Sequence, residues 1–124
     1  MPAKVLLLED DADQLEVLAI LLSLECGRES VLARSYDELT RLGDVPLACE
    51  LALLDVNLGP EQPSGLDAYR WLRERGFAGR VCFLTGHARH HPLVVAALRM
   101  GDVRVVEKPI ETAELRKLVE GRGA

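Results

Sequence analysis

Five short apolar runs recur along the chain, and each is separated from the next by a stretch with the features of a helix. The runs are Lys4 to Leu8, Ser30 to Ala33, Leu51 to Asp55, Val81 to Leu84 and Val103 to Val106. Their length is typical of buried strands. Strands that alternate with helices favour a parallel sheet with both faces covered. Because the crossovers are right-handed, the sequence predicts an α/β fold, a doubly wound (βα)5 sandwich with a five-stranded parallel sheet.

The segments between these runs carry start and stop signals for helices. The expected helices run from Asp11 or Asp13 to about Glu25, from Tyr36 to Leu42, from Ser64 to near Gly76, from Pro92 to Gly101 and from Thr112 to Glu120. Ser64 and Asp67 have the spacing of a capping box. The 124 residues are the size of one ordinary domain, and no repeat or linker divides them. We therefore expect residues 1–124 to form a single domain.

Charged side chains are distributed unevenly along the chain. Residues 1–64 carry 4 basic and 13 acidic side chains, and residues 65–124 carry 11 and 7, so the net charge is −5. An acidic chain without a run of Lys or Arg argues against direct binding of nucleic acid. The acidic first half leaves open a cation site. The overall composition, 48% apolar and 28% charged, is that of a globular protein.

The sequence carries no recognisable targeting or membrane segment. Its start, MPAKVLLLED, lacks the length, apolar core and cleavage site of a secretory signal, and no stretch approaches the roughly 18–20 apolar residues of a membrane span. The three cysteines, Cys26, Cys49 and Cys82, show no CxxC spacing, so we interpret them as reduced thiols. These features predict a cytoplasmic protein that does not bind membranes.

Polar side chains gather at the carboxyl ends of the predicted strands, where open parallel sheets bind their ligands. They are Glu9, Asp10 and Asp11 after the first strand, Asp55 at the end of the third, Thr85 after the fourth and Lys108 after the fifth. The first turn, LLEDDADQ, has no glycine with which to cradle a phosphate. Its carboxylates would instead attract a hard divalent cation, and they favour Mg²⁺.

In this setting, Asp55 has the features of a nucleophile that forms an aspartyl phosphate. Phosphoryl transfer requires mainly positioning and neutralisation of charge on the equatorial oxygens. Mg²⁺, the Lys108 ammonium and the Thr85 hydroxyl would each take one of those oxygens. A separate general base is not expected, since an ordinary Asp carboxyl is ionised at pH 7.

The elements VLLLEDD, LALLD, VCFLTG and VVEKP, in this order and spacing, closely resemble the receiver domain of two-component response regulators. The resemblance spans nearly the whole chain. It implies the flavodoxin-like strand order 2-1-3-4-5, which is a known order for doubly wound sheets. It also implies that Asp55 is the phosphoacceptor, that Asp10 holds Mg²⁺ directly and Glu9 through water, and that Asn57 offers its backbone carbonyl to the metal.

The same resemblance implies partners and an output. Thr85 would be the switch hydroxyl and Lys108 the phosphate-pairing lysine, while Asp11 caps the first helix. A sensor histidine kinase or a phosphotransfer protein would donate the phosphoryl group. The face formed by residues 92–101, 103–106 and 112–120 would report to a downstream protein or form a homodimer.

Three features depart from the family pattern. Three residues before the lysine, where the family usually has Tyr or Phe, the chain has Val105, which cannot act as a rotating aromatic switch. The Pro and Gly expected four and eight residues after the phosphoacceptor come late, as Pro60 and Gly65, so the loop is about two residues longer. Asn57 and His87 lie where side chains flank the attack path and should tune dephosphorylation.

These features support a stand-alone receiver, because the last predicted helix ends within four residues of Ala124. Such a receiver would catalyse only its own phosphorylation and dephosphorylation and would not otherwise be an enzyme. One alternative is a phosphorylation-independent adaptor, which Val105 and the longer loop would allow. Another is a small phosphatase with an aspartyl intermediate. A phosphatase would need an acid two residues after the nucleophile, and Asn57 argues against it.

The first predicted helix is apolar almost all round. One stripe, Leu15, Leu18, Ala19 and Leu22, should face the sheet, and a second consists of Val17, Ile20, Leu21 and Leu24. The second stripe could make extra core contacts or form a docking surface for the helical histidine domain of a kinase. Trp71 should be a partly buried anchor on the third helix. His87, His90 and His91 lack acids or cysteines at metal-binding spacing, so we interpret them as exposed loop residues.

Overall fold

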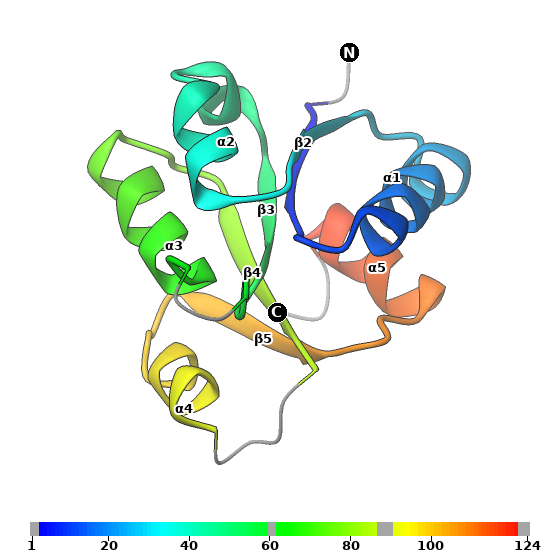
Figure 1. The fold of residues 1–124 in the computed structure, drawn as a ribbon. Helices are drawn as coiled ribbons and strands as arrows, with labels where there is room; N and C mark the ends of the chain where they lie inside the picture. Colours follow the sequence, from blue (N-terminus) through cyan, green and yellow to red (C-terminus); the bar gives the residue numbers. More distant parts are fainter. Residues whose placement is uncertain (1–2, 60–61, 87–90, 122–124) are drawn as a thin grey trace.

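The computed structural model describes residues 3–59, 62–86 and 91–121. Its centre is a parallel sheet in the order β2-β1-β3-β4-β5, as predicted (Figure 1). The strands are β1 (Val5–Leu8), β2 (Ser30–Ala33), β3 (Leu51–Asp55), β4 (Arg80–Thr85) and β5 (Val103–Glu107). All neighbouring strands pair in parallel. The fold is therefore the predicted doubly wound (βα)5 sandwich.

Among the described residues, five helices cover the two faces of the sheet. They are α1 (Ala12–Cys26), α2 (Tyr36–Arg41), α3 (Gly65–Glu74), α4 (Pro92–Leu98) and α5 (Thr112–Glu120). Helices α1 and α5 lie on one face, and α2, α3 and α4 lie on the other (Figure 1). A short 3-10 turn, Val45–Ala48, precedes β3 and was not predicted. None of the helices in this described part is long and apolar enough to traverse a bilayer.

The central strands are buried on both faces, which explains why they appear in the sequence as continuous apolar runs. In β1, Leu6 and Leu8 pack in the core beneath α2, α3 and α4, while Val5 and Leu7 pack beneath α1 and α5. Strand β2 lies at an edge, and its Leu32 is exposed. Two apolar layers therefore hold the central strands rigidly and carry their carboxyl ends to one edge of the sheet.

Capping side chains define where the helices begin and end. The Asp11 carboxylate accepts hydrogen bonds from the backbone N–H groups of Asp13 (2.9 Å) and Gln14 (3.1 Å), and Gly27 ends α1 in the left-handed conformation. Ser64 and Asp67 form the predicted capping box at the start of α3. These contacts satisfy N–H groups that have no partner within the helix. The predicted capping roles of Asp11 and Ser64 are confirmed.

The predictions for Trp71 and for the histidines have different outcomes. Trp71 on α3 is half-buried, as expected, and the Arg75 guanidinium lies 5.0 Å from the centre of its ring. His91 is half-buried and not exposed as predicted, because it caps α4 and its Nδ1 accepts a hydrogen bond from the Leu93 backbone N–H at 3.2 Å. His87 and His90 lie outside the described residues, so their predicted placement stays a prediction.

Gly65 makes the closest approach between the start of α3 and the end of β3. Its N–H donates to the Val56 carbonyl at 2.9 Å, and a Cβ at this position would lie 2.1 Å from the Asp55 carbonyl oxygen. Only glycine fits at such a distance. The longer loop after Asp55 therefore still delivers a glycine to the backbone of the proposed phosphoacceptor.

We predict that Gly65→Ala lowers the free energy of unfolding by about 2–4 kcal/mol, because the added methyl group would push the backbone of Asp55 away. Gly101→Ala is the matched control, since a Cβ there meets nothing within 4 Å, and it should change stability by less than about 0.5 kcal/mol. Urea denaturation measures both variants. Equal effects of the two substitutions would contradict this account of Gly65.

Candidate functional site

The buried polar side chains among the described residues gather at the carboxyl ends of β1, β3 and β4. Glu9 is 2% exposed, Asp55 5% and Thr85 1%. Glu9 directly follows β1, and Asp55 and Thr85 are the last residues of their strands. Because neighbouring strands are parallel and in register, their ends meet at one edge. The site predicted from the sequence is thus assembled at the expected place.

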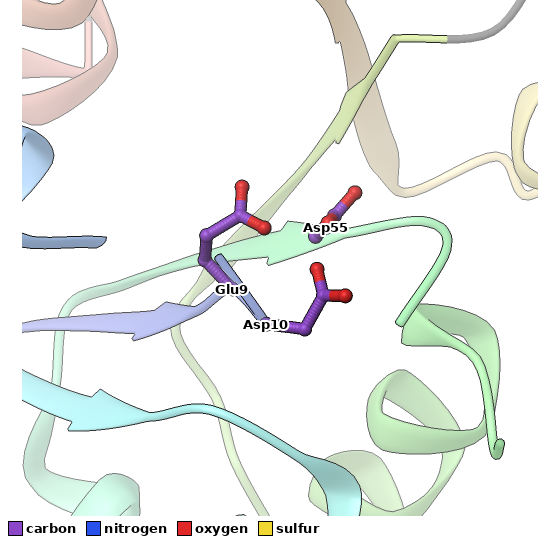
Figure 2. Close-up of side chains that lie close together, drawn as sticks. All are labelled: Glu9, Asp10 and Asp55. Atoms are coloured by element: carbon purple, nitrogen blue, oxygen red, sulfur yellow. The ribbon is translucent and has the colours of Figure 1, made fainter. Parts of the chain in front are cut away.

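Three carboxyl groups converge at this edge. Figure 2 shows Glu9 and Asp10 coming from the end of β1 and Asp55 from the end of β3. One oxygen from each residue lies within 4.8 Å of the others. Glu9 and Asp55 are buried and Asp10 is exposed, so the cluster opens to solvent on the side of Asp10.

The Lys108 ammonium is inserted between the two buried carboxylates. Its Nζ lies 2.5 Å from Glu9 Oε1 and 3.2 Å from Asp55 Oδ2. The Lys108 backbone N–H donates to the Thr85 carbonyl at 2.7 Å, and its peptide bond to Pro109 is cis. One cation therefore faces two buried anions, which leaves the cluster short of positive charge.

This shortage of positive charge shifts the acidity of the groups. Burial and the adjacent Glu9 raise the pKa of Asp55 to about 8, and the Lys108 ammonium offsets only part of the rise. Burial also opposes ionisation of Glu9, but hydrogen bonds with Asp55 and Lys108 outweigh it and hold the pKa of Glu9 below its usual value. Burial alone would lower the pKa of Lys108, yet its bonds with Glu9 and Asp55 raise it.

The raised pKa of Asp55 bears on one expectation from the sequence. The sequence predicts a carboxylate that is ionised at pH 7, whereas burial and the neighbouring Glu9 favour the protonated form of Asp55 when no cation is bound. A divalent cation beside the carboxyl group would favour its ionised form. The ionisation of Asp55 is therefore coupled to the charge of whatever binds the cluster.

The donor set fits a magnesium ion. Glu9, Asp10 and Asp55 offer hard carboxylate oxygens, and an opening toward solvent lets a metal ion keep several waters, as Mg²⁺ prefers. A cation would also supply the positive charge that the cluster lacks. These three residues are the ones that could hold the ion.

Asn57 lies next to the cluster, on the loop after β3. Its backbone N–H approaches Asp55 Oδ1 at 3.4 Å, and its side-chain oxygen accepts a hydrogen bond from the Gly59 N–H at 2.9 Å. The side chain thus orders its own loop. A role for its backbone carbonyl in metal binding stays a prediction, and so does the role of His87, which lies outside the described residues.

Two further residues complete the surroundings of the site. Val105 is half-buried and packs against the core beneath α2, α3 and α4, in register with Phe83. Gln14, which the sequence did not single out, places Oε1 3.1 Å from Lys108 Nζ. The two residues are 94 positions apart, so no local pattern could have indicated this contact.

Comparison with known sequences gives a consistent result. A family model for the response regulator receiver domain matches residues 5–120. The chain is 35% identical over 117 residues to the response regulator protein TodT of Pseudomonas putida, and 32% identical over 111 residues to TmoT of Ectopseudomonas mendocina. Each match covers 90% of this chain but only 47% and 48% of the relative. The chain thus spans about half the length of these two proteins.

Solved structures show the same arrangement. A receiver domain protein from Clostridium thermocellum has a TM-score of 0.81 at 23% identity, covering 96% of this chain and 92% of that one. A CheY-like protein from Methanospirillum hungatei has a TM-score of 0.79 at 22% identity, with coverage of 98% and 93%. The receiver domain of NtrX from Brucella abortus has a TM-score of 0.79 at 25% identity, with coverage of 95% and 96%. The first two likenesses bear on the fold alone.

We predict that Asp55 destabilises the cation-free fold as the pH rises. Its pKa of about 8 in the folded protein exceeds the unfolded value of about 4, so the folded state binds the proton more tightly. Stability is therefore lost as the pH rises from about 4 to about 8. Asp55→Asn removes this titration, and its advantage over the wild type should grow with pH to about 5 kcal/mol at pH 8, because the shift of about four pKa units is worth about 1.4 kcal/mol per unit.

Urea denaturation in EDTA between pH 5 and 8 measures this difference. Ser23→Ala serves as the control, because Ser23 is exposed on α1 and carries no titratable group, and its difference from the wild type should stay nearly constant with pH. An Asp55→Asn advantage that is independent of pH, or that shrinks as the pH rises, would contradict the raised pKa of Asp55.

Proposed function

The chain belongs to the response regulator receiver domain family, and from this premise we propose that Asp55 accepts a phosphoryl group from a phosphohistidine. The donor would be a sensor histidine kinase or a phosphotransfer protein. One observation carries this proposal: the buried Asp55 carboxyl group lies 3.2 Å from the Lys108 ammonium and within 4.8 Å of two further carboxyl groups at the sheet edge. This arrangement combines a nucleophile with charges that can stabilise a transferred phosphoryl group.

In the proposed transfer, a carboxylate oxygen of Asp55 attacks the phosphorus atom of the donor. A P–O bond to Asp55 forms while the P–N bond to the donor histidine breaks, and the electron pair returns to the imidazole nitrogen, which takes up a proton. Lys108 pairs with a phosphoryl oxygen as its contact with Asp55 is released. Attack by water on phosphorus later breaks the P–O bond and returns the carboxylate and inorganic phosphate.

Glu9, Asp10 and Asp55 would hold Mg²⁺ in this reaction. Bound there, Mg²⁺ neutralises developing negative charge and favours the ionised form of the nucleophile. The protein side chains contribute orientation. Lys108 holds the two buried carboxylates in place, and the Asp55 backbone is fixed by its contact with Gly65.

Thr85 is the proposed switch hydroxyl. It is buried, it ends β4, and its carbonyl is joined to the Lys108 N–H at 2.7 Å. A hydroxyl that moves toward the phosphoryl group would therefore also act on the end of β5. We propose that this change reaches a downstream protein through the face formed by α4, β5 and α5.

A phosphorylation-independent adaptor is the second candidate, and Val105 is the observation that favours it. This side chain is half-buried against the core, in the place where the family usually has a rotating aromatic ring. An aliphatic side chain has no such ring to move. The phosphatase alternative is weaker, because Asn57 offers an amide that already accepts from Gly59 and no acid for proton transfer.

We further propose that α1 provides the docking surface for the donor. The second apolar stripe of this helix is largely open to solvent, with Val17 55%, Ile20 47% and Leu24 77% exposed. Leu21, in contrast, packs against the core. A helix of the donor could bury the three exposed side chains, which form what we call the α1 ridge. The exposure favours docking over the alternative that the whole stripe makes extra core contacts.

We predict that acetyl phosphate and Mg²⁺ add the mass of one phosphoryl group to the protein, through an acid-stable and base-labile bond. Asp55→Asn should abolish the addition, because it removes the nucleophile. Lys108→Ala should slow it by about tenfold or more, because a charge partner of the phosphoryl group is lost. Intact-mass spectrometry over time measures all three proteins.

Absence of any mass gain in the wild type would contradict the proposed function and favour the adaptor. A gain that persists in Asp55→Asn would contradict the choice of Asp55. Steady release of product from unrelated phosphomonoesters would favour the phosphatase.

For the α1 ridge, we predict that the triple variant Val17→Ser, Ile20→Ser, Leu24→Ser slows phosphotransfer from autophosphorylated histidine kinases by about tenfold or more, because apolar contact is lost. Phosphorylation by acetyl phosphate, which needs no docking, should change by less than about twofold. The control is Leu98→Ser on α4, a side chain that is 51% exposed. An equal slowing with both donors, or with the control, would contradict docking on α1.

A further inference from the structure

The Lys108 ammonium is surrounded by three oxygen acceptors from different parts of the chain. Two are the buried carboxylates, Glu9 Oε1 at 2.5 Å and Asp55 Oδ2 at 3.2 Å. The third is the amide oxygen of Gln14, at 3.1 Å. Because an ammonium has three N–H donors, these acceptors match its full donor capacity. Gln14 is thus the uncharged member of the three acceptors that surround Lys108.

The three acceptors differ in what happens to them during the proposed reaction. Glu9 and Asp55 belong to the carboxylate cluster that could hold a cation, and Asp55 also becomes the phosphorylated group. Their oxygens would be drawn to new partners. Gln14 is uncharged and stands outside the cluster, so its bond to Lys108 can persist when the other two are broken.

The position of Gln14 is fixed by the start of α1. Its backbone N–H is held by the Asp11 carboxylate at 3.1 Å, and the next residue, Leu15, is buried and donates its N–H to the Asp11 carbonyl at 3.0 Å. The side chain therefore extends from a rigid turn. Gln14 itself is exposed, so its replacement should leave the core intact.

We propose that Gln14 is a positioning residue for Lys108, keeping the ammonium beside the acceptor site while the carboxylates exchange partners. This inference rests on the proposed function, because it assumes that Lys108 pairs with a phosphoryl oxygen on Asp55. A neutral amide suits the task better than a carboxylate would. A carboxylate at position 14 would compete for the ammonium and repel the incoming phosphoryl group.

Gln14 also lies where a partner could reach it. Together with Lys108 it lines a groove between α1 and the segment that connects β5 to α5, which also includes Val17, Pro109 and Ile110. Val17 belongs to the α1 ridge. A donor helix seated on that ridge would therefore lie against the same pair that orients the ammonium.

The test uses beryllofluoride, which mimics a phosphoryl group on a carboxylate, at saturating Mg²⁺ with calorimetric detection. Gln14→Ala should weaken its binding by about three- to tenfold, which is the effect of losing one ordinary hydrogen bond from an exposed side chain. Gln14→Glu should weaken it further. Ser23→Ala, an exposed neutral replacement on the same helix, is the control and should bind as the wild type does.

A double-mutant cycle separates positioning of Lys108 from a general effect on the helix. When Lys108 is already Ala, adding Gln14→Ala should change the beryllofluoride affinity by less than about twofold. An unchanged affinity of the single Gln14→Ala variant would overturn the inference, as would an equal loss with and without the Lys108 side chain. In both cases wild-type binding leaves the proposed function standing. A wild type that fails to bind beryllofluoride would overturn both.

Discussion

Two buried carboxylates, Glu9 and Asp55, share the single ammonium of Lys108, and the chemistry of the site depends on this imbalance. Burying charge is costly unless it is paired, and one cation cannot fully compensate two anions. The imbalance, together with burial, raises the pKa of Asp55 to about 8. A divalent cation or a change in the partners of Lys108 would alter that balance. The same charge imbalance therefore makes the ionisation of Asp55, the proposed nucleophile, sensitive to any cation that binds the cluster.

The sheet accommodates this charge imbalance because it holds the three charged groups in fixed positions. Glu9 and Asp55 extend from strands whose preceding residues are buried on both faces. The third member, Lys108, follows β5 and is tied to β4 through the Thr85 carbonyl. Because each group is fixed by a different strand, none can move away to relieve the repulsion without disturbing the core. Rigid placement of charge, established during folding, is the preorganisation that the proposed phosphoryl transfer would use.

Val105 and helix α1 connect the site to the two proposed interaction surfaces. Val105 takes part in the core, so the usual aromatic switch is replaced by aliphatic packing on the face proposed for output. Helix α1 combines a buried stripe with an exposed apolar ridge, and its first turn contributes Gln14 to the Lys108 site. The proposed docking surface and the reaction centre are thus joined through one helix.

The sequence alone determined the strands, the order of elements, the caps at Asp11 and Ser64, and the acids, Thr85 and Lys108 at the strand ends. These follow from local patterns, since burial on both faces imposes continuous apolar runs and helix termini need partners for their N–H groups. The tertiary structure decided the raised pKa of Asp55, the exposure of the α1 ridge, the need for Gly65 and the contact of Gln14 with Lys108. Those depend on solvent exclusion and on distances between residues far apart in the chain, which no local pattern encodes.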